Sequence, residues 1–140
     1  MSSHKTEIIE QLKNYFRDRP EVLSAYLYGS AAKDKLRFDS DIDIAVFLSE
    51  RIERDKYFDY RISTSTSISR ILHREVDVVV FNEAPHVLAH QILKYGIRIF
   101  ERDKQRGRAR EARAVMEYFD FLPYRKRCED AMVKHIKEAS

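Results

Sequence analysis

The chain of 140 residues has the length of one ordinary domain, which leaves room for one hydrophobic core and none for a separate substrate domain. Apolar residues make up 44% and charged residues 35%, a composition too apolar for a disordered chain. It holds no apolar run long enough for a membrane span, no signal core and a single cysteine, Cys128, which excludes an internal disulfide. We therefore expect a cytoplasmic protein.

The net charge of +3 resides in residues 101–140, because residues 1–100 carry 15 basic and 15 acidic side chains. Within that tail, residues 102–113 hold six positive and two negative side chains. A segment of this kind indicates a solvated helix face or a contact with nucleic acid, an acidic protein or an anionic nucleotide. The pattern itself leaves these alternatives open.

Helical and strand-like spacing of apolar residues alternates along the chain. In chain order, the pattern predicts a helix ending before Pro20, a strand over 22–28, a polar loop over 31–40 and a strand over 42–48. A helix over 53–74, a strand over 75–81 and a helix over 85–94 capped by Gly96 are expected next. The chain then continues with a predicted strand over 97–100 and two helices separated by Pro123. The predicted class is α/β (two-layer α+β), with a mixed sheet of about four strands flanked by helices.

Several side chains are expected to have structural roles. We expect Phe58, Ile62, Ile68 and Leu72 to form the inner face of the helix over 53–74. Cys128 shares a helical stripe with Met132 and Ile136 and is expected to be buried and inert. His86 and His90 stand four residues apart, a spacing that suits a metal, but no accompanying acid pattern supports one, and a helix-surface role is favoured.

Asp41 and Asp43 flank Ile42 where the polar loop enters a buried strand. Residues two apart in a strand point to the same side, so the two carboxylates repel each other unless a cation neutralises them. Carboxylate oxygens suit Mg²⁺, and a pair of such ions can stabilise the attacking and leaving oxygens of a phosphoryl displacement. The pair therefore indicates a metal site.

Asp77 lies inside the apolar run VDVVVF. An isolated carboxylate there would be costly, and pairing with Arg or Lys on an outward face is one explanation. If its strand lies next to residues 42–48, Asp77 joins the other two acids, shares a metal and accepts the proton of an attacking hydroxyl.

Gly29 and Ser30 end the strand over 22–28. Glycine allows the backbone to approach a phosphate closely, and the serine hydroxyl and following amides can hold phosphate oxygens. The sequence thus places a phosphate-holding turn ten residues before an acid pair. Gly-Ser and Asp-x-Asp each occur often by chance, but the two motifs at this fixed spacing are a far more specific signal.

Residues 29–43, GSAAKDKLRFDSDID, resemble the signature of the DNA polymerase β-like nucleotidyltransferase superfamily, and more narrowly its minimal nucleotidyltransferase (MNT) members. Such proteins are typically the MntA-type antitoxins of HEPN/MNT toxin–antitoxin pairs. The resemblance covers about residues 5–101. It implies a minimal nucleotidyltransferase domain over 1–101, with a helical extension over 102–140 packed on it.

The resemblance implies Mg²⁺-dependent transfer of AMP from ATP to a tyrosine hydroxyl of a cognate HEPN ribonuclease toxin, which is thereby neutralised. Asp41 and Asp43 would hold two Mg²⁺ ions, and Asp77 would complete one site and assist deprotonation. The nucleotide would be bound by Gly29, Ser30, Lys33 and Ser40.

One departure concerns the residues after Gly29-Ser30, where many relatives have a small residue followed by Arg-Gly. Here Ala32, Lys33 and Asp34 occupy that stretch, so the positive charge remains but the planar guanidinium does not. Three alternatives stay open: an antitoxin that acts by binding alone, a transferase for small molecules, and direct nucleic-acid binding.

Overall fold

The computed structural model describes residues 3–32 and 41–139 of the chain. In these ranges helices and strands alternate in the order α1 (Ser3–Arg17), β1 (Val22–Tyr28), β2 (Ile42–Leu48), α2 (Tyr57–Leu72), β3 (Val76–Val80), α3 (His86–Tyr95), β4 (Ile97–Glu101) and α4 (Lys104–Ala139). Short 3₁₀ turns cover Gly29–Ala31, Arg54–Lys56 and Phe81–Glu83. The bounds of β1 and β2 are those that the sequence predicts.

The four strands form one mixed sheet in the order β3-β2-β1-β4. β1 pairs with β2 and with β4 in antiparallel fashion, whereas β2 and β3 are parallel. A parallel pair needs a long crossover connection, and α2 supplies it between β2 and β3. The predicted mixed sheet flanked by helices is confirmed.

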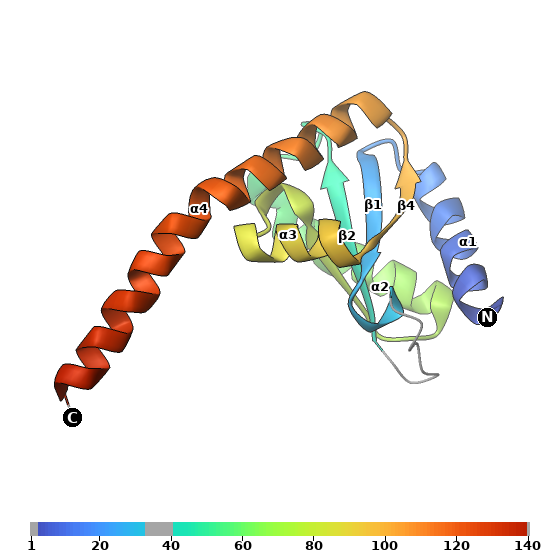
Figure 1. Ribbon diagram of the computed structural model, residues 1–140. Helices are drawn as coiled ribbons and strands as arrows, with labels where there is room; N and C mark the ends of the chain where they lie inside the picture. Colours follow the sequence, from blue (N-terminus) through green and yellow to red (C-terminus); the bar gives the residue numbers. More distant parts are fainter. Residues whose placement is uncertain (1–2, 33–40, 140) are drawn as a thin grey trace.

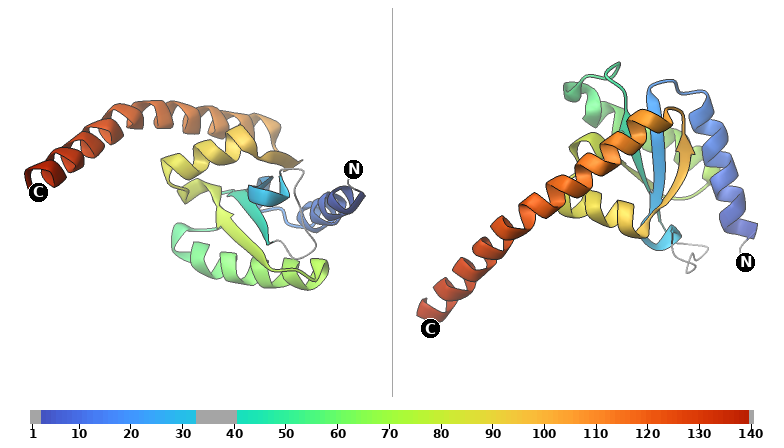
Figure 2. Two further views of the ribbon diagram at one scale, coloured as in Figure 1. Left: turned by 60° about the horizontal axis from the view of Figure 1, so that its bottom comes forward. Right: turned by 45° about the horizontal axis from the view of Figure 1, so that its top comes forward.

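Helices cover both faces of the sheet, which gives three layers rather than two (Figures 1 and 2). One core unites α1 and α2 with alternate strand residues such as Ile44 and Val46. The second core lies under α3 and the first part of α4 and includes Ala45 and Phe47. Because successive strand residues face opposite sides, β2 is buried on both faces.

The inner face of α2 differs from the prediction. Phe58 is 69% exposed and Ile62 is 55% exposed, whereas Ile68 and Leu72 are buried as expected. The helix begins at Tyr57, and the stripe that packs inward consists of Tyr57, Thr64, Ile68 and Leu72. Phe58 and Ile62 are rotated about the helix axis by about 100° from that stripe, so their side chains point to solvent.

The C-terminal residues form one helix and not two, since α4 continues through Pro123. Proline there removes a single backbone hydrogen bond, and helix-forming residues on both sides allow the helix to continue. α4 is curved, and its last half projects away from the rest of the molecule (Figure 2). The predicted interruption is therefore wrong.

Cys128 lies on the projecting half of α4 and is exposed, so its predicted burial is also wrong. The apolar stripe around it faces solvent in the part of the chain that the structure describes, since every residue from 123 to 139 is exposed. None of the helices described here is long and apolar enough to cross a membrane.

Candidate functional site

Asp43 and Asp77 lie side by side on neighbouring strands, each at the second residue of its strand, β2 and β3. The parallel pairing of these strands puts the two residues in direct register. Their strand neighbours Ile42, Ile44 and Val78 belong to the core under α1 and α2. Since side chains alternate along a strand, both carboxylates face the opposite side, toward α3.

Asp41 precedes β2 by one residue and is exposed. It raises the pKa of Asp43 through its charge, although less than Asp77 does, and burial of Asp43 contributes most. We call these three carboxylates, Asp41, Asp43 and Asp77, the acid edge. Asp43 is the half-buried one. The charges of the acid edge repel one another in the absence of a cation.

The turn after β1 closes on the acid edge from the neighbouring strand. Gly29 adopts a φ of +71°, a conformation that favours glycine, and a Cβ at this position would overlap the Asp43 carboxylate oxygen Oδ2. Ser30 follows in the same 3₁₀ turn and is exposed. The structure therefore brings the predicted phosphate turn and the predicted metal acids together.

The acid edge fits a divalent cation by its chemistry and charge, since its donors are carboxylate oxygens and its excess negative charge raises the pKa of Asp43. The three carboxylates are not gathered as a preformed site. Within residues 3–32 and 41–139 no group of three or more His, Cys, Asp or Glu side chains is arranged to hold a metal. Repulsion between like charges opposes such a cluster until a cation joins it.

Two neighbours of the acid edge were missed by the sequence reasoning. Tyr28 pairs with Asp43 across β1 and β2, and its pKa is raised to about 12, first by burial and then by the charges of Asp43 and Asp77. Arg61 on α2 places its terminal nitrogen NH2 4.0 Å from Asp77 Oδ1. Tyr28 adjoins the glycine motif in sequence, but no local pattern marks Arg61.

Lys33 and Ser40, the other predicted nucleotide-binding residues, lie outside the described residues. On the described side of the turn, the backbone carbonyl of Ala32 accepts a hydrogen bond of 2.9 Å from Lys5 Nζ on α1.

The sequence matches the family model described as "Polymerase beta, Nucleotidyltransferase" over residues 10–105. This range contains the whole sheet and all three residues of the acid edge. The chain belongs to the polymerase beta nucleotidyltransferase family. Its class as a nucleotidyltransferase is thereby confirmed. No curated protein matches the sequence significantly.

Solved structures support the same fold. A toxin–antitoxin crystal structure with AMP-PNP has 22% sequence identity and a TM-score of 0.73, covering 93% of this chain and 98% of that one. The MntA-HepT toxin–antitoxin structure has 21% identity and a TM-score of 0.72, covering 91% and 98%. A tri-AMPylated Shewanella oneidensis HEPN toxin in complex with MNT antitoxin gives 21% identity and a TM-score of 0.73, covering 92% and 98%.

The basic segment over 102–113 makes contacts within the chain. Arg102 donates to backbone carbonyls at the end of α1, and Arg106 and Arg108 pair with Glu50 and Glu101 respectively. These pairs neutralise much of the positive charge that the sequence alone presents as a single basic run.

The two helical histidines pack against α4. His90 stacks on Tyr118 with ring centroids 3.8 Å apart, and the rings of His86 and Phe121 are 5.3 Å apart. A helix-packing role replaces any metal role for this pair.

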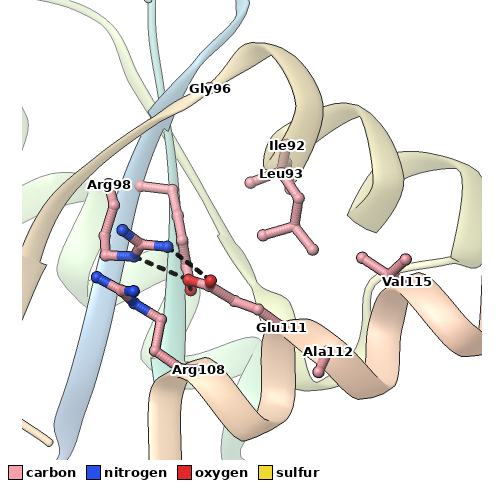
Figure 3. Close-up of a pocket in the computed structure, with 9 residues that line it drawn as sticks. Ile92, Leu93, Gly96, Arg98, Arg108, Glu111, Ala112 and Val115 are labelled. Atoms are coloured by element: carbon pink, nitrogen blue, oxygen red, sulfur yellow. Dashed lines mark hydrogen bonds and ion pairs between the residues drawn. The ribbon is translucent and has the colours of Figure 1, made fainter. Parts of the chain in front are cut away.

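A cavity of about 490 Å³ lies between α3, β4 and α4, apart from the acid edge. Arg98 and Glu111 form two hydrogen bonds of 2.6 and 2.9 Å across it, and Arg108 lies beside them (Figure 3). The Tyr26 hydroxyl also donates to Glu111 at 2.6 Å. Because these polar groups satisfy one another, the network joins α4 to the sheet and does not resemble a reactive centre.

Proposed function

We propose that this nucleotidyltransferase is an MntA-type antitoxin that transfers AMP from ATP to a tyrosine hydroxyl of a cognate HEPN ribonuclease toxin in the cytoplasm. The observation that carries the proposal is the register of Asp43 beside Asp77, with the Gly29 turn closing directly on Asp43. The similar structures, which include toxin–antitoxin complexes, one with AMP-PNP and one with a tri-AMPylated toxin, support it.

Each part of the site has a task in this reaction. Gly29 and Ser30 would bind the triphosphate together with Lys33 and Ser40, and Asp41 and Asp43 would hold two Mg²⁺ ions. Asp77 would complete one metal site and accept the proton of the acceptor hydroxyl. The acceptor oxygen would bond to the α-phosphorus of ATP as the bond between that phosphorus and the β-phosphate breaks, so that pyrophosphate leaves. Bound Mg²⁺ would neutralise charge on the attacking and leaving oxygens. The chain's own contribution is positioning, since phosphoryl transfer needs little covalent chemistry from a protein.

The direct test is the intact mass of the cognate HEPN toxin that this proposal requires, after incubation with the chain, ATP and Mg²⁺. The toxin should gain the mass of one or more AMP units. Asp43→Asn should lower the rate by about 100-fold or more, because a metal ligand is lost. Asp59→Asn serves as the control, since Asp59 is exposed on α2 and its variant removes the same charge.

Asp43→Asn should remain folded and be no less stable than the natural chain, because the like charges of Asp77 and Asp41 and partial burial already disfavour the Asp43 carboxylate. A toxin that is inhibited in the complex without any gain of mass would contradict AMP transfer and favour an antitoxin that acts by binding alone.

A further inference from the structure

Arg61 belongs to α2, thirty-two residues after Gly29 in sequence, yet its guanidinium reaches the acid edge. Its Nε donates a hydrogen bond of 2.8 Å to the backbone carbonyl of Val78, the residue that follows Asp77 on β3. Its NH2 nitrogen lies 4.0 Å from Asp77 Oδ1. One side chain therefore contacts both the third acid and the strand that carries it.

The hydrogen bond to Val78 explains why the guanidinium is held in place. Among the strands of residues 3–32 and 41–139, β3 lies at the edge of the sheet and pairs with β2 alone, so one side of its backbone has no strand partner there. Arg61 bonds to the edge with Nε, and its planar fork leaves the terminal nitrogens directed along the strand. The arginine makes these two contacts with two different nitrogens of a rigid plane, a geometry that the single ammonium nitrogen of lysine does not reproduce.

The ion pair between Arg61 and Asp77 contributes little to the stability of the fold. Asp77 is 61% exposed and Arg61 36% exposed, and an ion pair of that kind contributes at most about 1 kcal/mol. The charge of Arg61 also reaches Tyr28, whose pKa is raised by burial and by the charges of Asp43 and Asp77 and lowered by Arg61.

The sheet order shows which end of the site Arg61 occupies. The phosphate turn follows β1, Asp43 lies on β2, and Asp77 lies on β3 at the open edge. If the nucleotide is bound at the turn after β1, the acceptor hydroxyl must approach from the other end of the site, beside β3.

We propose that Arg61 is a positioning residue at the acceptor end, which fixes Asp77 and supplies a permanent positive charge against the three acids. The acceptor side of this inference rests on the proposed function.

The first test measures Mn²⁺ binding to the protein without nucleotide, by electron paramagnetic resonance of free Mn²⁺. Arg61→Gln removes a cation that repels the metal, so it should bind Mn²⁺ roughly two- to tenfold more tightly. Arg61→Lys keeps the charge and should bind like the natural chain. Arg70→Gln is the matched control, because Arg70 is exposed on the same helix and the same charge is lost.

The second test measures AMP transfer by the same variants. Arg61→Gln should lower kcat about tenfold or more while KM for ATP stays unchanged, because Asp77 is misplaced and the nucleotide turn is not. Arg61→Lys should recover part of kcat. Tighter metal binding together with slower transfer is a pair of opposite effects that partial unfolding cannot produce.

Equal Mn²⁺ affinity in Arg61→Gln and Arg70→Gln would overturn the inference, as would an unchanged kcat or a loss confined to KM for ATP. If the natural chain transfers no AMP, the proposed function fails, and the Mn²⁺ comparison still decides whether Arg61 acts on the acid edge.

Discussion

At the scale of single residues, Gly29 connects the phosphate turn with the acid edge. Its positive φ and the closeness of Asp43 Oδ2 both require the absence of a side chain. The neighbouring strand supplies Asp43, so the constraint comes from a contact between β1 and β2 and not from the turn alone.

Gly29→Ala should lower the free energy of unfolding by about 1–3 kcal/mol, because it adds left-handed strain and a steric overlap with Asp43. It should also abolish nucleotide transfer. Urea unfolding and the transfer assay measure the two effects.

Gly107→Ala is the control for this prediction. A Cβ at Gly107 would meet Ser24 Oγ at 3.5 Å, an ordinary contact, and the position is helical. Alanine there should be neutral or stabilise the protein by up to about 1 kcal/mol. Equal losses of stability in the two variants would contradict the role assigned to Gly29.

At the scale of elements, Arg102 joins the end of β4 to the end of α1. Its NH2 nitrogen donates to the carbonyls of Phe16 and Arg17 at 2.8 and 2.9 Å, and its Nε donates to Val22 at 3.1 Å. The last carbonyls of a helix lack partners within it, and a cation there also suits the helix dipole. A residue from the basic segment thus serves as a cap.

Arg102→Ala should lower the free energy of unfolding by about 1–2 kcal/mol, because several charge-assisted hydrogen bonds are lost at a partly hydrated site. Arg113→Ala removes an exposed pair with Glu117 on α4 and should cost about 0.5 kcal/mol or less. Denaturant unfolding that ranks the two variants equally would show that Arg102 is not a cap.

At the scale of the whole molecule, the protein consists of a three-layer body and a projecting helix. The body holds both cores and the acid edge, while the first half of α4 packs on α3 and β1. Beyond Pro123 the helix is exposed on all sides, including Met132 and Ile136. Burial of apolar area therefore stabilises only the part before that point.

Removal of the residues after Tyr124 should leave the thermal midpoint of the body unchanged, because residues 125–139 are all exposed and belong to neither core. Helical circular dichroism should fall in proportion to the helix removed. A midpoint several degrees lower would show that the projecting half supports the body. Full-length protein in the same buffer is the reference.

The sequence determined β1 and β2, the mixed sheet and the acid pattern, because strand spacing, glycine and the Asp-x-Asp pair are read from neighbours along the chain. It could not decide which side of α2 packs inward, since Tyr57 and Phe58 are both aromatic and only packing against α1 and the sheet places Tyr57 in the core. The sequence pattern also predicted that Cys128 is buried, whereas this residue is exposed on the projecting half of α4.

Contacts between distant segments were decided by the tertiary structure alone. The parallel pairing of β2 with β3 puts Asp77 beside Asp43, and the crossover through α2 then brings Arg61 to the same edge. Two arginines of the basic run pair with Glu50 and Glu101, which come from other elements. The physical reason is that periodicity specifies local structure, whereas electrostatic partners depend on which segments the burial of apolar surface brings together.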